Sequence, residues 1–292
     1  MRDGFGPKPT DVGDPDLLAT ENLTIRFGGH VAVDGVTCSF APGTLTAIVG
    51  PNGAGKTTYF NLISGQLPAS AGTVHLDGQL LSGQSVSART RAGLGRAFQL
   101  TNLFPNLSVL ENIRLAVQAR LPGAHRHGLN LWSIWSDHRG LTARALEILE
   151  SVAMVDRQNA IVASLPHGDQ RKLEVALLMA LEPKVYMFDE PTAGMSHEEA
   201  PVILNLIRAL KADRSKTILL VEHKMDVVRE LADRIIVLHN GQLVADGDPA
   251  TVIASPVVQE AYLGASHQDV SVPDGAEAQP DLSPAGNRRN PS

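Results

Sequence analysis

The residues best suited to chemistry lie in one short stretch with the pattern Gly-x-x-x-x-Gly-Lys-Thr. The stretch reads Gly50, Pro51, Asn52, Gly53, Ala54, Gly55, Lys56, Thr57 and Thr58. Glycines allow backbone N–H groups to turn inward around a phosphate. The lysine would reach the β- and γ-phosphates, and the Thr57 hydroxyl would take one Mg2+ position. The stretch predicts a nucleotide phosphate loop, since a turn that only caps a helix would leave the lysine and threonines unexplained.

Two elements must position this loop. The β-branched apolar run 45–49 precedes it, and an amphipathic segment, 59–63, follows it and ends at Gly65. This order predicts a strand, the loop and a helix. The positive end of the helix dipole would then point at the bound phosphate.

A second group of polar residues follows two other predicted strands. Asp189 and Glu190 end the apolar run 185–190, and His223 comes just after the strand 216–221. In a parallel sheet, the carboxyl ends of the strands face the ligand. We therefore expect the two carboxylates near the phosphate loop, whereas a lone histidine after a strand is more often structural than functional.

The composition is that of an ordinary globular protein, with 292 residues, 43% hydrophobic residues and a formal net charge of −6. This charge disfavours nucleic-acid partners. The only cysteine, Cys38, lies in a strand-like run, so we expect a core residue and no internal disulfide. The apolar runs are far shorter than the roughly 18 residues that span a bilayer, and no signal-peptide core is visible. We therefore expect a cytoplasmic protein that meets a membrane only through a partner.

The chain divides into four parts by composition and periodicity. Residues 1–16 and 265–292 are polar and rich in Pro and Gly, which predicts a disordered arm and tail. Residues 17–264 predict one α/β domain. Within it, residues 85–165 are expected to form a mostly helical insert.

Hairpins and helix caps add detail to this α/β domain. Strands 18–27 and 31–40 are expected to form an antiparallel element, and hairpins are expected at 73–81 and 234–246. Capping boxes, in which a serine is followed three residues later by a glutamate, are predicted at Ser108 and Ser196. Pro201 predicts an irregular first turn in the helix that follows Ser196.

Segment 121–140 interrupts the helical pattern with three histidines and two tryptophans. They are His125, His127, His138, Trp132 and Trp135. No cysteine or carboxylate clusters with the histidines, so we do not expect a metal site. The tryptophans are equally compatible with a partner contact and a local plug.

Four signals stand in a characteristic order: the phosphate loop, Phe98-Gln99, the stretch 165–170, and the run ending in Glu190 with His223 beyond it. This order resembles the nucleotide-binding subunits of ABC transporters over residues 17–264. Softer signals resemble the branched-chain amino acid importers: Arg26-Phe-Gly-Gly29, the stretch 168–172, the insert after Leu121, and Ala-Tyr-Leu-Gly at 261–264.

The resemblance implies a P-loop ABC ATPase fold, the cofactors ATP and Mg2+, and roles for particular residues. Phe27 would stack on adenine. Asp189 would hold Mg2+ through water, and Glu190 would polarise the attacking water. Gln99 would sense the metal and the γ-phosphate, and His223 would contact the γ-phosphate.

The signature stretch departs from the family pattern Leu-Ser-Gly-Gly-Gln. It reads Leu165, Pro166, His167, Gly168 and Asp169. Pro166 removes the serine hydroxyl that would bind the partner subunit's γ-phosphate. Gly168 and the N–H groups that open a helix predicted over 170–181 remain, and Asp169 is expected to point away. Ser196 also replaces the aspartate of many relatives.

The resemblance further implies partners: a second cassette of the same or another chain, two transmembrane permease subunits and, indirectly, an extracytoplasmic solute-binding protein. The chain would sit peripherally on the cytoplasmic face of the inner membrane and power import of branched-chain amino acids. Alternatives are a cassette for urea or another polar solute, a lipid extractor, and a soluble ABC-type ATPase. A P-loop kinase and a nucleotide sensor without turnover fit the motifs less well.

Overall fold

The structure is a computed structural model that describes residues 16–97, 103–121, 138–256 and 258–259. Its centre is a six-stranded sheet in which all described strands are parallel except the edge strand β10. The order across this sheet is β10 (Gln242–Gly247), β9 (Arg234–His239), β3 (Leu45–Val49), β8 (Thr217–Val221), β7 (Val185–Asp189) and β6 (Leu94–Ala97). The three strands β3, β7 and β8 are buried along their whole length, as expected for apolar runs covered on both faces.

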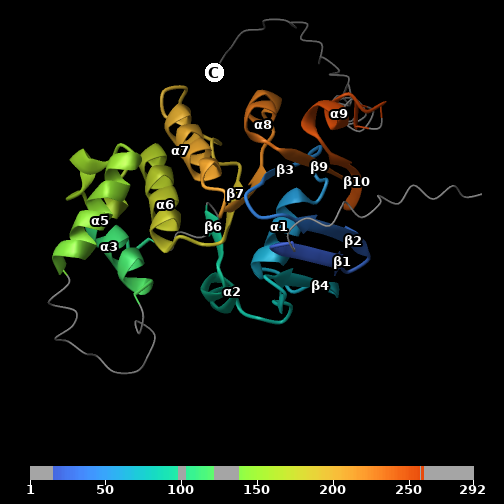
Figure 1. The fold of residues 1–292 in the computed structure, drawn as a ribbon, viewed down its shortest axis with the longest axis horizontal. Helices are drawn as coiled ribbons and strands as arrows, with labels where there is room; N and C mark the ends of the chain where they lie inside the picture. Colours follow the sequence, from blue (N-terminus) through green and yellow to red (C-terminus); the bar gives the residue numbers. More distant parts are fainter. Residues whose placement is uncertain (1–15, 98–102, 122–137, 257, 260–292) are drawn as a thin grey trace, which may run out of the picture.

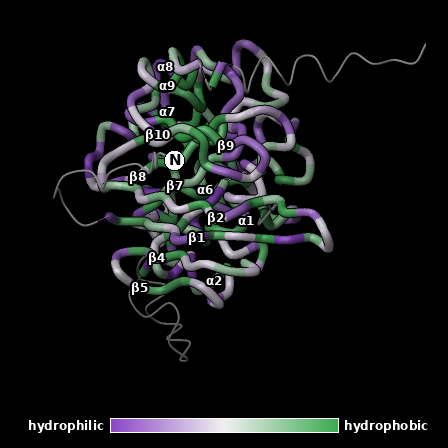
Figure 2. The backbone as a smooth tube through the Cα atoms, turned by 90° about the vertical axis from the view of Figure 1, so that its right-hand side faces the viewer, coloured by the Kyte–Doolittle hydropathy of each residue, from purple (hydrophilic) through white to green (hydrophobic). Residues whose placement is uncertain are grey.

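A second, antiparallel sheet lies beside the core sheet (Figure 1). Its order is β2 (His30–Phe40), β1 (Leu18–Phe27), β4 (Ala71–Leu76) and β5 (Gln79–Leu80). In Figure 2, hydrophilic and hydrophobic residues alternate along this layer, which is the pattern of strands buried on one face. The predicted hairpins are confirmed as β4–β5 and β9–β10.

The described helices form two groups (Figure 1). Around the sheets lie α1 (Lys56–Ser64), α2 (Val86–Ala92), α7 (Ala200–Ala212), α8 (Met225–Leu231) and α9 (Pro249–Ile253). On the far side from the antiparallel sheet lie α3 (Val109–Ala119), α5 (His138–Ser151) and α6 (His167–Leu181). The capping box at Ser108 is confirmed. Among the described helices, none combines the length and apolar character that a bilayer span requires.

The structure differs from the expected elements at two places. The segment 85–165 contains a strand of the core sheet, β6, which is too short and too interrupted by Gly95 and Arg96 to show a strand pattern. Helix α6 begins at His167 rather than at Gln170, because Pro166 takes the N-cap position, where no backbone N–H is needed. Residues 261–264, which contribute the Ala-Tyr-Leu-Gly signal, lie outside the described residues.

One apolar core joins the helical group to the sheet. It includes Leu149 of α5, Leu173 of α6, Ile203 of α7 and Phe188 of β7, all fully buried. This shared core fixes α6 relative to the end of β7, where the predicted carboxylates lie.

Candidate functional site

The phosphate loop connects β3 to α1 and requires its glycines. Gly50 and Gly55 have φ values of 149° and 96°. A Cβ atom on Gly50 would lie 2.1 Å from the Leu238 carbonyl oxygen, and one on Gly55 would lie 2.5 Å from that of Ala32. Both positions therefore combine left-handed backbone with close packing that only glycine permits.

Lys56 is folded into this loop. Its Nζ atom donates hydrogen bonds to the carbonyl oxygens of Gly50 (2.8 Å) and Pro51 (2.9 Å). The side chain is almost fully buried, and burial lowers the pKa of the amine while Glu190 and Asp189 oppose that shift. The loop thus holds a cation within electrostatic reach of both predicted carboxylates, which suits it to a polyphosphate.

The end of β7 brings Glu190 to His223. Asp189 pairs with Val221 of β8, and the backbone N–H of Glu190 donates to the Val221 carbonyl oxygen at 2.9 Å. Beyond these strands, Nε2 of His223 lies 2.5 Å from Oε1 of Glu190. The two side chains are 42% and 37% exposed, so water or a phosphate can reach them.

Asp189 itself is almost fully buried and is paired with Arg96, a residue that belongs to none of the predicted motifs. Nη2 of Arg96 donates to Oδ2 of Asp189 at 2.8 Å. Burial raises the pKa of Asp189, and the guanidinium opposes that shift. The sequence offered one signal for Arg96, its place in a short run just before Phe98-Gln99. It gave no sign of the pairing, because Asp189 lies 93 residues further along the chain.

Glu222 is a second residue whose contacts the sequence did not reveal. It is 3% exposed, and its carboxylate accepts hydrogen bonds from the Thr192 hydroxyl (2.9 Å) and the His223 backbone N–H (2.8 Å). It therefore ties the loop after β7 to the histidine after β8.

The signature stretch opens α6 and contacts the segment 194–199 of its own chain. Pro166 is the N-cap and makes no side-chain cap. A Cβ on Gly168 would lie 2.1 Å from Oε1 of Glu199, and one on Gly194 would lie 3.7 Å from Cε1 of His167. Helix α6 therefore meets the start of α7 within one subunit.

The charges of this region are balanced locally. Asp169 pairs with Lys172 (3.1 Å) and Arg157 (3.8 Å) of the same subunit. Ser196 and Glu199 exchange the two predicted capping hydrogen bonds, each 3.2 Å long, ahead of the helix that begins at Ala200. Ser196, one of the two departures from the family pattern, thus closes a turn just before α7; the helix itself has Glu199 in the N-cap position and no side-chain cap, so the predicted capping box does not cap it.

Phe27 and Gln99 are the other two predicted site residues. Phe27 ends β1 with half of its surface exposed. The turn after it leads into β2, whose Ala32 packs against the phosphate-loop residue Gly55. Gln99, like His125, His127, Trp132 and Trp135, lies outside the described residues.

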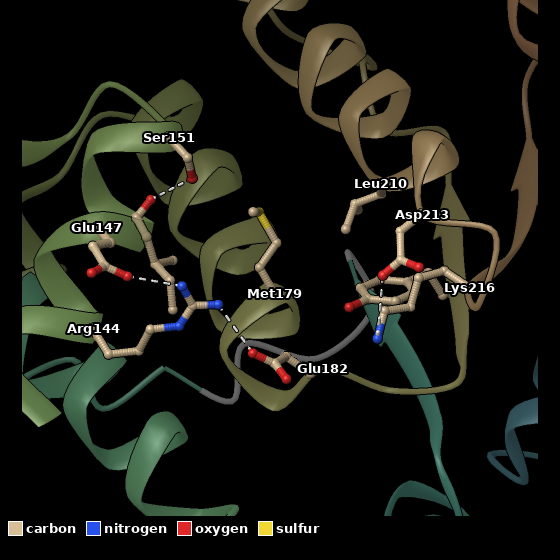
Figure 3. Close-up of a pocket in the computed structure, with 10 residues that line it drawn as sticks. Arg144, Glu147, Ser151, Met179, Glu182, Leu210, Asp213 and Lys216 are labelled. Atoms are coloured by element: carbon tan, nitrogen blue, oxygen red, sulfur yellow. Dashed lines mark hydrogen bonds and ion pairs between the residues drawn. The ribbon is translucent and has the colours of Figure 1, made fainter. Parts of the chain in front are cut away.

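A cavity of about 320 Å³ lies between the helical group and the core (Figure 3). Arg144 and Glu182 line one side, with Arg144 also paired to Glu147, while Asp213 and Lys216 line the other. Since Glu182 and Lys216 precede β7 and β8, the cavity lies at the amino edge of the sheet. The phosphate loop lies at the carboxyl edge, so this cavity is separate from the phosphate site.

A glycine loop around a buried lysine, with two carboxylates and a histidine at the same sheet edge, defines a P-loop nucleotide-binding domain. The sequence profile of the ABC transporter family matches residues 33–193, and that of the branched-chain amino acid ATP-binding cassette transporter matches residues 242–268. The chain therefore belongs to the ABC transporter family, as one of its ATP-hydrolysing, ATP-binding subunits.

Individual relatives agree with this assignment. The chain is 36% identical to the high-affinity branched-chain amino acid transport ATP-binding protein LivG of Escherichia coli K12, over 85% of this chain and 98% of LivG. It is 35% identical to BraF of Pseudomonas aeruginosa over the same shares. The ADP-bound crystal structure of the ABC transporter cassette MJ1267 is similar with a TM-score of 0.70 and 30% identity, covering 86% of this chain and 99% of MJ1267.

Proposed function

We propose that this chain powers a branched-chain amino acid importer, working with a second cassette and two transmembrane permease subunits at the cytoplasmic face of the inner membrane. An extracytoplasmic solute-binding protein would deliver the solute. The observation that carries the ATPase part is the meeting of Lys56, Asp189, Glu190 and His223 at one sheet edge. The solute rests on the similarity to LivG and BraF and on the profile match over residues 242–268.

In this proposal the site residues divide the work. Lys56 and the loop N–H groups bind the phosphates, and Phe27 stacks on adenine. Glu190 accepts a proton from the attacking water while His223 orients Glu190 and contacts the γ-phosphate. Asp189 and Glu190 are close enough for the charge of Glu190 to raise the pKa of Asp189, and the Arg96 guanidinium opposes that shift. The pairing with Arg96 therefore favours Asp189 as the fixed anion and leaves Glu190 as the base.

Hard oxygen donors fit a magnesium ion at this place. The Thr57 hydroxyl lies in the first turn of α1, and the carboxylate of Asp189 lies close enough to Lys56 for each to affect the other's pKa. Gln99 would complete this set. Mg2+ would supply charge neutralisation on the phosphates.

The signature stretch would serve the second cassette. Its N-terminal helix residues contact Gly194 and Glu199 of their own chain, and their described hydrogen bonds do not reach the phosphate loop. Gly168 and the opening N–H groups of α6 are therefore available to the nucleotide of a partner subunit. ATP binding would favour the closed pair, and hydrolysis would release it.

A permease contact is supported by an apolar groove on the helical group. A cavity of about 310 Å³ lies between α3 and α6 and opens beside Phe104, shortly after Gln99 in the chain. Phe104 and Leu115 line it and are 54% and 41% exposed. We infer that a helix of the permease inserts here and passes the motion of the cassette to the membrane subunits.

The test is a native pull-down of the tagged chain from its own membranes, with every co-purifying protein identified by mass. Two multi-span subunits with a binding protein specific for branched-chain amino acids would support the proposal. Only soluble or nucleic-acid-bound partners would overturn the transport role and leave the ATPase intact. Leu115→Ser should lose the permease subunits, whereas the control Leu80→Ser, at an exposed leucine on β5, should retain them.

A further inference from the structure

We propose that Arg96 is a positioning residue for ATP hydrolysis: its guanidinium fixes the Asp189 carboxylate in the orientation that receives the metal ion of the nucleotide. The inference rests on the proposed metal-holding role of Asp189 and adds to it a residue that none of the motifs above contains.

The contact between the two residues is short and closed to solvent. Arg96 and Asp189 lie on the neighbouring parallel strands β6 and β7, and the 2.8 Å hydrogen bond joins Nη2 to Oδ2. The side chains are only 5% and 8% exposed. A carboxylate held by a charged, directional donor in a dry site loses the freedom to rotate, which is how residues behind a metal ligand orient it.

The other nitrogen of the same guanidinium reaches the helix that carries the phosphate loop. Nη1 donates to Oδ1 of Asn61 (2.7 Å) and to the Ser64 hydroxyl (3.0 Å), both near the end of α1. The guanidinium carbon also lies 5.3 Å from the centre of the Phe60 ring. One planar group thus sets the distance between α1, whose first turn contains Lys56, and the carboxylate at the end of β7.

This fork geometry is specific to arginine. A lysine at position 96 would keep the positive charge but offer a single point donor, which cannot hold the carboxylate and the end of α1 in one rigid plane. Substitution by lysine therefore separates orientation from charge. The predicted loss is in metal binding, with nucleotide binding in the absence of metal retained.

Arg89 provides a matched control. It is also 5% exposed and braces the same end of α1, donating to the carbonyl oxygens of Leu62 (2.9 Å) and Ile63 (2.6 Å). Its described hydrogen bonds reach only backbone carbonyls, the third being that of Gln84. Arg89→Lys therefore disturbs a buried arginine of α2 that contacts the end of α1, without touching Asp189.

The experiment uses the full chain as wild type, Arg96→Lys, Arg89→Lys and Asp189→Asn, each with the non-hydrolysable analogue β,γ-imido-ATP. Mn2+ binding is measured by electron paramagnetic resonance, and analogue binding in EDTA by calorimetry. We expect Arg96→Lys to weaken Mn2+ binding by about tenfold, the usual scale for groups that orient a metal ligand. Its analogue affinity in EDTA, and both affinities of Arg89→Lys, should match the wild type.

The variants separate the two hypotheses. If Asp189→Asn binds Mn2+ like the wild type, the proposed role of Asp189 fails. If Asp189→Asn weakens Mn2+ binding and Arg96→Lys does not, only the inference about Arg96 is overturned. The same holds if Arg89→Lys loses as much Mn2+ affinity as Arg96→Lys does. Should Arg96→Lys not fold, the double variant Asn61→Ala/Ser64→Ala replaces it: it removes the two hydrogen bonds that Arg96 donates to α1, and unchanged Mn2+ binding would reject the inference.

Discussion

His223 and Glu190 lie 33 positions apart in the chain, yet Nε2 of the histidine is 2.5 Å from Oε1 of the glutamate. Two local features produce this contact. Glu190 adopts a left-handed backbone with φ of 51°, which turns its side chain out of the strand direction. Glu222, buried beside them, accepts from the His223 backbone N–H and so fixes the start of the loop that carries the histidine. The pair is therefore held by backbone geometry, as the proposed activation of a water molecule requires.

Replacing Glu190 by glutamine should remove the proposed catalytic base while the site still binds ATP. The side chain keeps its size, so ATP binding should stay within about twofold of the wild type, while hydrolysis should fall by about 10²–10⁴-fold. The variant should then accumulate as a closed, ATP-bound dimer, which light scattering would detect. Glu198→Gln, at an exposed glutamate outside the described ion pairs, is the control and should hydrolyse ATP normally. Near-normal turnover of Glu190→Gln would rule out its role as the base.

Replacing Lys56 by alanine should remove nucleotide binding itself. The amine lies inside the loop and would exchange its two carbonyl partners for phosphate oxygens. A hydrogen bond to a charged group contributes about 1.5–3 kcal/mol, so ATP should bind about tenfold to a hundredfold more weakly. Calorimetry with ATP measures this, with Lys184→Ala, at a half-exposed lysine paired to Asp77, as the control. Equal ATP affinity in Lys56→Ala and wild type would contradict the prediction.

The phosphate loop, the carboxylates and the main strands were predictable because each is local in sequence. Runs such as 185–189 are apolar throughout and are buried along their length. The hairpin turning on Asp77-Gly78 and the capping box at Ser108 follow from residues within a few positions of one another. In these places, local propensity and the final fold agree.

The contacts that complete the site were not predictable in this way. Arg96 meets Asp189 and Thr192 meets Glu222 only because β6, β7 and β8 are neighbours in the sheet. The strand that contains Arg96 has four residues, one of them a glycine, and shows no periodicity. Long-range pairing of this kind leaves no mark in the local pattern of a single sequence.

Substitution of Gly168 should test whether the start of α6 contacts only Glu199 of its own chain or also the nucleotide of a second cassette. A methyl group there would lie 2.1 Å from the Glu199 carboxylate, which must move and give up the hydrogen bond that it accepts from the Ser196 backbone N–H. The net loss of such a hydrogen bond costs about 1 kcal/mol, and Glu199→Ala alone should show that cost. If the start of α6 meets the nucleotide of a second cassette, as proposed, Gly168→Ala should in addition lower ATPase activity, because the methyl group would narrow that contact.

The double variant Gly168→Ala/Glu199→Ala decides between the two effects. It removes the clash inside the subunit and leaves the methyl group in place. If its ATPase activity stays low while Glu199→Ala is active, the backbone at position 168 meets the partner's nucleotide. Recovery of activity in the double variant would instead show that only the clash with Glu199 mattered.

Cys38 should be unreactive towards alkylating reagents in the folded protein, and its ionisation should lower the free energy of unfolding at alkaline pH. Its thiol is buried, and burial raises its pKa from 9.0 to about 12, although Arg234 partly opposes the shift. Alkylation of this only cysteine near neutral pH should therefore require unfolding, so labelling followed by mass spectrometry reports opening of the β2 region.

The pH dependence follows from the direction of that shift. Because the folded state favours the neutral thiol, the contribution to stability is complete below pH 9.0, the ordinary value, and is lost as the pH rises to about 12. Urea unfolding measured across this window should show the wild type losing more stability than Cys38→Ala, which has no thiol to ionise. Tyr59, whose pKa is raised mainly by burial, is present in both proteins, so the effect of its burial is common to the two. Equal losses in the two proteins would show that Cys38 does not ionise differently on folding.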